Sequence, residues 1–363
     1  MQVGNKLYEY GYDELGNITD IELNGVETES YTYDDLNQLK TVTRGNDVYV
    51  YTYAPGGNIQ SVTKNGSAIK AYTYYSNQWK DMLKSYNGEN ITYDGVGNPL
   101  TYYDGMSFGW QNGRQLKTVY HAGLQYNYEY DEGGKRVSKQ SDEDGISKEY
   151  YWLDGRLYQE KDTETGKVIN FYYDESGRMI GFYTNMTSTP GTYYYAYNLQ
   201  GDVIGIVDST GTVVVEYTYD EWGKPLTKTG TLANTIGTIN PIRYRGYYYD
   251  SETGFYYCQS RYYDPEIGRW INADGYVSTG QDITGYNMFA YCGNNPVNRV
   301  DPTGQFWITS LIVTAVAVVC TVALSSCSAQ PTSDVGAASP YSPSNSTDYN
   351  CHAYALGEKR GNM

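Results

Sequence analysis

A tyrosine-rich unit recurs along the chain from near its start to about Thr229. Each copy reads Tyr-x-Tyr, then a few Asp, Gly or Asn residues, then a short apolar–polar run, as in YTYDDLNQLKTV, YTYAPGGNIQSV and YTYDEWGKPLTK. Such repeats constrain the fold strongly, because every copy must form the same local structure and bury its apolar face against its neighbours. The turn glycines recur at roughly 20 residues or a small multiple of it: Gly16, Gly57, Gly97, Gly113, Gly134, Gly155, Gly177, Gly201 and Gly223.

The physics of one unit predicts a β-hairpin. Alternation along a strand places both tyrosines of Tyr-x-Tyr on one face and Thr or Glu on the other. The Asp-x-x-Gly segment supplies an Asx-type start and a residue with positive φ, which together close the hairpin. Because a single hairpin is marginally stable, the units must pair edge to edge. The repeats therefore predict an all-β fold, a continuous antiparallel sheet that can coil.

The tyrosine stripes have two interpretations. The chain has 45 Tyr against 6 Phe and 6 Trp. In the first interpretation, Tyr ladders fill and stiffen the sheet. In the second, exposed rings bind glycans or a cell wall. The first is favoured, because the Tyr positions follow the strand period in every unit.

Charge and residue counts exclude some functions. The net charge is -16, with 42 acidic against 26 basic residues, which argues against nucleic-acid binding by the repeats. The only histidines are His121 and His352, so multi-His metal sites are excluded and no cofactor is expected. Five scattered cysteines do not suggest a disulfide framework. The start has no apolar signal-peptide region and enters the repeat pattern midway, so we expect a fragment of a longer protein.

The segment from Pro241 to Gly304 is also tyrosine-rich but differs from the repeats. We expect one strand over RYRGYYYD and, after a turn ending at Gly254, a second over FYYCQSRYYD. Asp301-Pro302-Thr303-Gly304 fits a type I turn, with Asp first, Pro second and Gly fourth. Taken singly, each acidic residue here is most simply explained as a turn cap.

Two sets of motifs resemble known families. The repeats resemble the RHS/YD-repeat family through the pattern Y-x-Y-D-x-x-G-x-[LIV]. The segment after them resembles the RHS repeat-associated core through two stretches, YYYDSETGFYYCQSRYYDPEIGRWINADG and YCGNNPVNRVDPTG. The resemblance implies a sheet that spirals into a hollow shell around a C-terminal polypeptide, commonly a toxin. It also implies a bacterial protein that is secreted or at the cell surface, and an immunity protein as a further partner.

In characterised relatives the core is an aspartyl autoprotease that cuts just after a DPxGL sequence. By the motif, the resemblance implies that Asp274 and Asp301 form the carboxylate pair and that the cut falls at Gln305 and Phe306. Two facing carboxyls cannot both ionise, so one holds a proton while the other activates water. The assisting cations would be Arg269 and Arg299, with Asp264 as a reserve acid.

Three features depart from the family pattern. Gly275 stands where a Pro is usual, Gln305 stands where Leu is usual, and GYVSTGQDIT lengthens the spacing between the two motifs. These departures concern the expected self-cleavage and not the expected shell.

Residues 305–327 are uncharged and apolar, and their length matches a membrane-spanning helix. A helix buried inside the shell, an internal signal sequence ending at LSSC and a buried strand are the alternatives. We expect an apolar, membrane-active helix that contacts the membrane over 306–327 and aids transfer of the payload. Residues 328–347 read as a Ser/Pro-rich linker.

The last residues, 348–363, would begin a variable toxin segment. The run Asn350-Cys351-His352 is similar to the start of papain-like and amidase-type hydrolases, in which the Cys opens a helix that lowers its thiol pKa. An ordinary Cys-His pair is the simpler alternative, and so short a segment cannot form an enzyme.

These observations predict a division into repeats (1–240), core (241–304), apolar segment (305–327), linker (328–347) and the start of a toxin segment (348–363). The leading hypothesis is a fragment of a bacterial RHS polymorphic toxin or wall-associated protein, whose repeats enclose and deliver the toxin. The alternative is a cell-surface adhesion or carbohydrate-binding protein anchored by the apolar segment.

Overall fold

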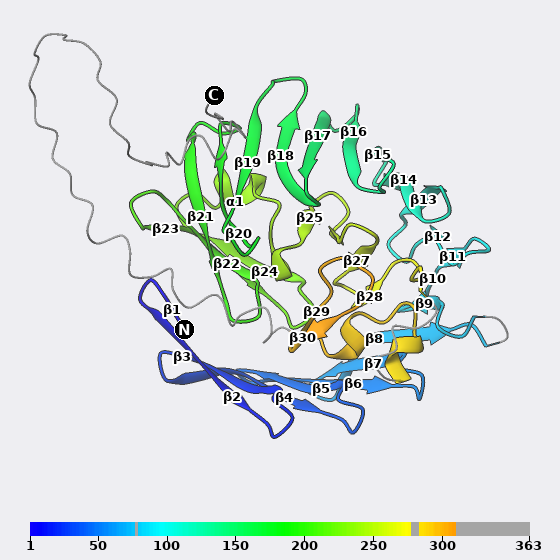
Figure 1. Cartoon of the computed structure of the whole chain (residues 1–363). Coiled ribbons are helices and arrows are strands. Elements are labelled where there is room, and N and C mark those ends of the chain that lie inside the picture. The colour runs from blue at the N-terminus through cyan, green and yellow to red at the C-terminus, as the bar shows by residue number, and fades with distance from the viewer. Residues whose placement is uncertain (77–78, 277–282, 310–363) are drawn as a thin grey trace, which may run out of the picture. The chain divides into compact units, whose positions relative to one another are not determined.

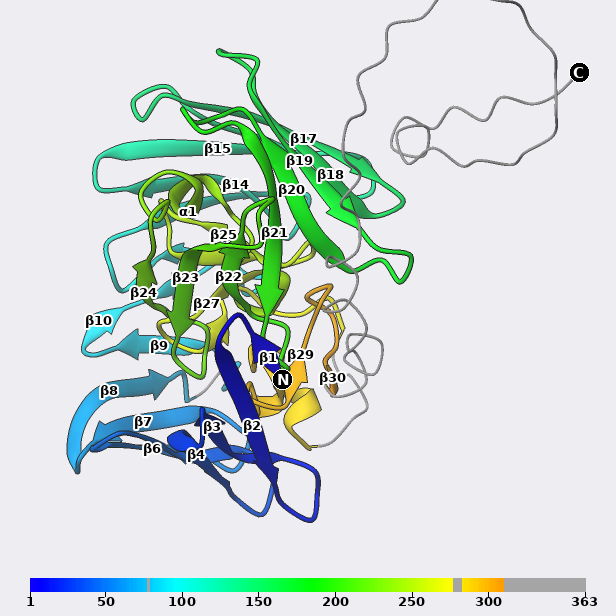
Figure 2. The same cartoon turned by 90° about the vertical axis from the view of Figure 1, so that its left-hand side faces the viewer.

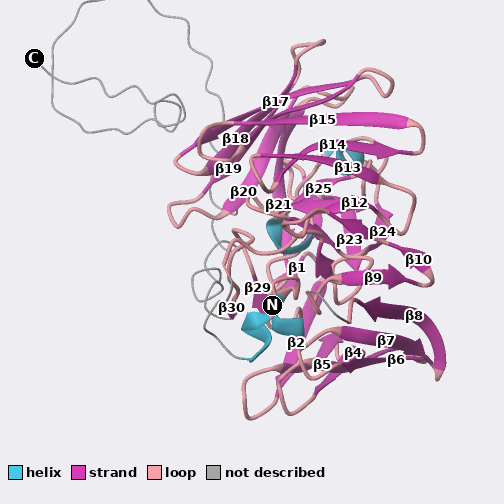
Figure 3. Cartoon of the chain, turned by 90° about the vertical axis from the view of Figure 1, so that its right-hand side faces the viewer, coloured by secondary structure: helices cyan, strands magenta, loops and turns pink. Residues whose placement is uncertain are grey.

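The computed structural model describes residues 1–76, 79–276 and 283–309, all within one unit, Met1–Val318. Strands pair with their neighbours in chain order and are antiparallel throughout, forming a 10-stranded and a 14-stranded sheet (Figure 1). The all-β prediction is confirmed: strands predominate, with a few short helices (Figure 3).

The first sheet contains β1 (Gln2–Val3), β2 (Lys6–Tyr12), β3 (Ile18–Leu23), β4 (Val26–Tyr33), β5 (Leu39–Arg44), β6 (Asp47–Tyr53), β7 (Ile59–Lys64), β8 (Ser67–Tyr74), β9 (Leu83–Tyr86) and β10 (Glu89–Asn90). The second contains β11 (Thr92–Tyr93), β12 (Pro99–Thr101), β13 (Ser107–Gln111), β14 (Gln115–His121), β15 (Leu124–Tyr130), β16 (Arg136–Ser141), β17 (Ile146–Leu153), β18 (Arg156–Asp162), β19 (Val168–Tyr173), β20 (Met179–Thr184), β21 (Gly191–Tyr197), β22 (Val203–Val207), β23 (Val213–Tyr219) and β24 (Pro225–Thr229). Helix α1 (Ile236–Ile239) follows.

The Asp-x-x-Gly turns close the hairpins as predicted. In the turn between β11 and β12, Asp94 Oδ1 accepts hydrogen bonds from the amides of Val96 and Asn98, both at 2.9 Å. Gly97 has a φ of +84°, and the strand register shifts between Thr92 and Tyr93. A left-handed residue after a type I turn is the usual source of such a bulge, so the sequence signal and the local geometry agree.

In several Tyr-x-Tyr segments the hydroxyl of the second tyrosine binds the preceding hairpin. The hydroxyl of Tyr53 donates to the Leu39 carbonyl at 2.6 Å, and that of Tyr74 donates to the Ile59 carbonyl at 2.7 Å. Tyr219 does the same to Val203 in the second sheet, at 2.8 Å. These hydroxyls cap backbone groups and their rings pack on the core cluster, which favours the structural interpretation of the ladder over glycan binding.

The core segment and the residues directly after it form two small sheets. One contains β25 (Tyr248–Asp250), β26 (Phe255–Tyr257), β27 (Tyr262–Asp264) and β28 (Arg269–Trp270), and the other contains β29 (Arg299–Val300) and β30 (Ile308–Thr309). The 3-10 helices are η1 (Tyr244–Gly246), η2 (Ile283–Tyr286) and η3 (Cys292–Asn294).

Both expected core strands are shorter than the sequence predicts. The first is strand only over β25, because Arg245 adopts a φ of +54° within η1. The second is two strands, β26 and β27, because the Cys258 amide donates to the Arg261 carbonyl and Gln259 has a φ of +64°, which makes a turn. Because both strands are rich in tyrosine, composition alone does not predict the turn that separates them.

The four-stranded core sheet lies between strands of the two repeat sheets in both views (Figures 1 and 2). Tyr72 of the first sheet donates from its hydroxyl to the Ile267 carbonyl at 3.2 Å. Arg136 of the second sheet forms a buried ion pair with Asp250, with 2.6 Å between Nη1 and Oδ2. The core segment therefore contacts both repeat sheets.

The start of the expected apolar helix is a strand instead. Ile308 and Thr309 form β30 and pair with Val300 and Arg299. Residues 310–327, the linker and the tail lie outside the described residues. Among residues 1–76, 79–276 and 283–309, no helix is long and apolar enough to span a membrane.

Candidate active site

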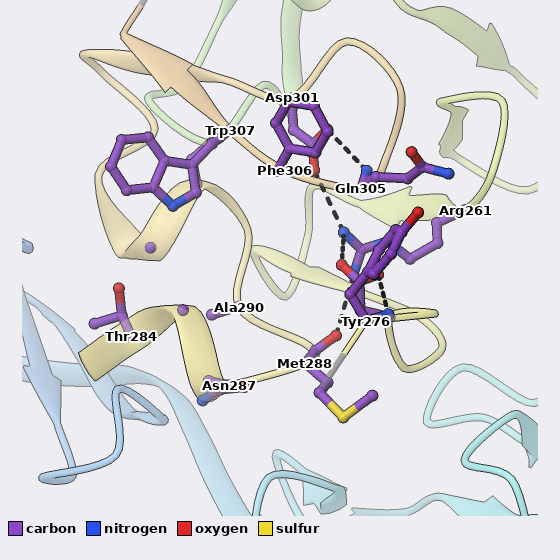
Figure 4. A pocket seen from close by; sticks show the side chains of 14 residues that line it. Arg261, Tyr276, Thr284, Asn287, Met288, Ala290, Asp301, Gln305, Phe306 and Trp307 are labelled. Carbon is purple, nitrogen blue, oxygen red and sulfur yellow. Dashed lines mark hydrogen bonds and ion pairs between the residues drawn. The ribbon is translucent and has the colours of Figure 1, made fainter. Parts of the chain in front are cut away.

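Two buried carboxylates meet at one guanidinium nitrogen. Arg261 Nη2 lies 2.8 Å from Asp274 Oδ2 and 3.3 Å from Asp301 Oδ2 (Figure 4). All three side chains are almost fully excluded from solvent. The two acidic residues selected by motif therefore lie together, although 27 positions separate them in the printed sequence.

Main-chain bonds fix each carboxylate. The Asp301 amide donates to the Tyr247 hydroxyl at 2.9 Å, and Asp301 Oδ1 accepts from the Gln305 amide at 3.0 Å. The Asp274 amide donates to the Met288 carbonyl at 3.0 Å, and its Oδ1 accepts from the Tyr276 amide at 2.9 Å. Each residue thus caps a local turn with one oxygen and directs the other oxygen to Arg261.

A small cavity of about 20 Å³ adjoins this pair. Its lining includes Arg261, Asp274 and Asp301, and also Gln305 and Phe306. A polar cavity of this size has room for a water molecule. The residues on both sides of the expected cut therefore border the same cavity as the two carboxylates.

Burial raises the pKa of both acidic residues above the ordinary value. For Asp301, burial is the main cause, Arg261 opposes it, and the neighbouring Asp274 charge adds to it. For Asp274, burial again raises the pKa, while Arg261 and Arg114 oppose it. Facing carboxylates of this kind retain a proton to higher pH than isolated ones, which is the condition for one to act as acid and the other as base.

The segment before the expected cut is tightly held. The Gly304 carbonyl accepts from Ser260 Oγ at 2.8 Å and from Arg261 Nε. Gly304 has a φ of +72°, and a Cβ placed there would lie 2.8 Å from the Cys258 carbonyl oxygen. Only glycine fits both the conformation and the space.

The two cations expected from the motif have other partners. Arg269 donates from Nη2 to the Asp81 carbonyl at 2.8 Å and lies against the Tyr74 ring. The Arg299 guanidinium lies 3.7 Å from the centroid of the Trp307 ring. The ion pairs described for Asp274 and Asp301 are formed with Arg261, which the sequence reasoning missed.

The remaining expected site residues lie apart from this pair or outside the described chain. Asp264 accepts hydrogen bonds from the Tyr102 and Tyr103 hydroxyls at 3.1 and 3.0 Å, and burial raises its pKa to about 7. Cys351 lies outside the described residues.

Comparison with known proteins places this architecture in a family. The family model described as the Teneurin YD-shell matches residues 5–297. The chain belongs to the Teneurin YD-shell family. Its repeats and core are those of an RHS/YD-repeat protein.

Among curated proteins, the YD-shell chain is 36% identical over 235 residues to the tRNA3(Ser)-specific nuclease WapA of Bacillus spizizenii, covering 63% of this chain and 10% of the relative. The tRNA nuclease WapA of Bacillus subtilis matches with the same identity and coverage. The double-stranded DNA deaminase toxin A of Burkholderia cenocepacia is 27% identical over 257 residues, covering 62% of this chain and 17% of the toxin. The chain thus spans about a tenth of the length of the WapA relatives.

Among solved structures, the crystal structure of TcdB2-TccC3-Cdc42 matches with a TM-score of 0.68 and 21% identity, covering 83% of this chain and 17% of that chain. The crystal structure of TcdB2-TccC3 matches with a TM-score of 0.65 and 20% identity, over the same shares. At these identities the likeness shows that the YD-shell fold is shared.

Arg261 carries no distinctive sequence signal. It lies in QSRYYD, one of several core segments that contain arginine, and nothing in its spacing from Asp274 or Asp301 sets it apart from Arg269 or Arg299. Only the turn between β26 and β27, which the sequence reasoning did not predict, brings it to the carboxylates.

Proposed function

We propose that this YD-shell chain is part of a bacterial RHS polymorphic toxin, that its repeats and core enclose a following polypeptide, and that the core cuts its own chain between Gln305 and Phe306. One observation carries the proposal. Asp274 and Asp301 share Arg261 Nη2 beside a cavity that Gln305 and Phe306 also line. The named activities of the WapA nucleases and the deaminase toxin support a toxic payload as the enclosed cargo.

The chemistry requires one ionised and one protonated carboxyl. The ionised carboxylate takes a proton from a water molecule in the cavity, and the oxygen of that water attacks the Gln305 carbonyl carbon. The protonated carboxyl gives its proton to the Phe306 nitrogen as the carbon–nitrogen bond breaks. The products are a carboxyl group on Gln305 and an amine on Phe306. Arg261 compensates the negative charge that remains on the pair.

The wider proposal concerns the whole protein. The repeats (1–240) and core (241–304) would form the shell, the apolar segment (305–327) would aid transfer by membrane contact, and the linker (328–347) would lead to the variable toxin segment (348–363). The protein would be secreted or held at the cell surface, act in competition between bacteria, and be neutralised by an immunity protein. Cys351 would belong to the payload.

Intact mass spectrometry of three variants tests the cleavage. After overnight incubation of the purified chain, we expect the parent and Asp264→Asn to be cut, and Asp274→Asn and Asp301→Asn to stay whole. Asp264 is the matched control, because it is a buried core aspartate that contacts tyrosine hydroxyls instead of Arg261. Cleavage of Asp301→Asn at the parent rate, or a parent that stays whole, would refute the proposal.

A further inference from the structure

The residue before Asp274 is held by the repeats. The Ala273 amide donates to the Gly97 carbonyl at 3.4 Å, and the Ala273 carbonyl accepts from Arg114 Nη1. Gly97 lies in the turn between β11 and β12, and Arg114 lies just before β14. The β11–β12 and β13–β14 turns of the second repeat sheet therefore hold the peptide groups on both sides of Ala273.

The packing around Ala273 leaves little freedom. Its side chain is fully buried in a small cluster with Met82 and Phe289. A Cβ built on Gly97 would lie 3.2 Å from the Ala273 Cβ and 2.9 Å from the Trp79 ring. A shift of this turn would therefore move Ala273, and with it the Asp274 main chain.

Arg114 also contributes charge to the carboxylate pair. Arg261 and Arg114 both lower the pKa of Asp274 against the effect of burial, and the Asp274 charge in turn raises the pKa of Asp301. Arg261 bonds to both carboxylates, whereas Arg114 reaches the site from the repeat sheet. Arg114 further lines a separate cavity of about 380 Å³ beside Thr303 and Gln305. It therefore contacts the residue before Asp274 and borders the same cavity as the segment that would be cut.

From these contacts we infer that Arg114 is a positioning residue for Asp274, so that the carboxylate pair is completed only where the second repeat sheet packs on the core. The inference rests on the proposed self-cleavage. Cleavage would then depend on assembly, because the core supplies both carboxylates and the repeats hold one of them in place. A chain whose repeats had not yet packed would keep its payload attached.

The pH profile of self-cleavage in Arg114 variants tests the inference. We expect Arg114→Gln to slow cleavage roughly 10- to 100-fold, because small displacements of a catalytic group have effects of this size. The part of the pH profile that reports ionisation of Asp274 should move to higher pH, because a positive charge that favours the ionised carboxylate is lost. Arg114→Lys should return that part of the profile toward its position in the parent. Arg156→Gln, an exposed arginine of β18, is the control and should behave like the parent.

The outcomes separate this inference from the proposed function. A parent that cuts, with an Arg114→Gln profile that matches it, would overturn the inference and leave the proposed function intact. A parent that does not cut would refute the proposed function. In that case a ¹³C NMR titration of the Asp274 carboxyl decides the inference: a higher pKa in Arg114→Gln than in the parent supports it, and equal values overturn it.

Discussion

At the residue scale, buried carboxyls of the core differ in charge state because their partners differ. Burial opposes ionisation of Asp250, yet Arg136 and Lys139 hold its pKa below the ordinary value. Burial likewise opposes ionisation of Asp264 and raises its pKa to about 7. The hydrogen bonds described for its side chain come from tyrosine hydroxyls and one amide. The pKa values of two aspartates in one small sheet are therefore shifted in opposite directions.

Asp264 makes stability depend on pH. Because its folded pKa is raised, its contribution is fully present below the unfolded value near 3.9 and is lost as the pH rises through about 7. The shift corresponds to a contribution on the order of 4 kcal/mol. We expect the free energy of unfolding, measured with urea at pH 5 and pH 8, to fall more between these values in the parent than in Asp264→Asn. An equal fall in both would contradict the assignment.

The carboxylate pair predicts a bell-shaped pH profile for self-cleavage. The rate should fall at high pH, where both Asp274 and Asp301 are ionised, and at low pH, where both are protonated. Because burial raises both pKa values, the maximum should lie above the range in which ordinary aspartates titrate. Time courses by gel densitometry across pH 3 to about 9 would measure this, and a rate independent of pH would rule out the pair.

At the element scale, the hairpins are joined by tyrosine hydroxyls as well as by strand pairing. A recurrent bond runs from the second tyrosine of a Tyr-x-Tyr segment to the carbonyl at the start of an earlier strand, as from Tyr53 to Leu39. On the opposite face, Thr32 and Thr41 hydroxyls lie 2.6 Å apart on adjacent strands. The tyrosine bond therefore joins a unit to the preceding one, and the threonine contact joins the two strands of a single unit.

Removal of one such hydroxyl should have a measurable cost. We expect Tyr53→Phe to lower the free energy of unfolding by about 1 kcal/mol, because a carbonyl loses its donor while the ring packing stays. Tyr120→Phe is the matched control, because that ring is half exposed, and it should change stability by less than about 0.5 kcal/mol. Equal effects in urea denaturation would show that the hydroxyl bonds do not stabilise the ladder.

Local signals explain which parts of the fold were predictable. The Asp94–Gly97 turn and the Tyr-x-Tyr face depend on residues a few positions apart, so sequence periodicity predicts them. The turn that places Arg261 depends on contacts with distant residues, among them the Gly304 carbonyl. The carboxylate pair was selected by resemblance to the family motif, but its cation was not, because a guanidinium can reach it from several places in the core.

At the scale of the described unit, core amides connect the repeats. Asn295 Nδ2 donates to the Asn37 carbonyl at 3.0 Å and to Asn17 Oδ1 at 3.3 Å, joining the β4–β5 and β2–β3 turns of the first sheet. On the second sheet, Asp250 pairs with Arg136 and Lys139. The core segment therefore holds turns and strands that are far apart in sequence.

Loss of an amide bridge should destabilise the whole unit. We expect Asn295→Ala to lower the free energy of unfolding by about 1 to 3 kcal/mol, because buried acceptors in the repeat turns lose their donor. Asn46→Ala, an exposed asparagine of the hairpin between β5 and β6, is the control and should have little effect. If both variants unfold at the same denaturant concentration as the parent, the core does not stabilise the repeats in this way.

The mass of the larger fragment after incubation in ¹⁸O-labelled water tests the central claim, that two core carboxylates direct water to the bond after Gln305. The account predicts a fragment that ends at Gln305 and carries one ¹⁸O atom in its new carboxyl group. An uncut chain, a fragment that ends away from the cavity, or a fragment without the label would contradict it.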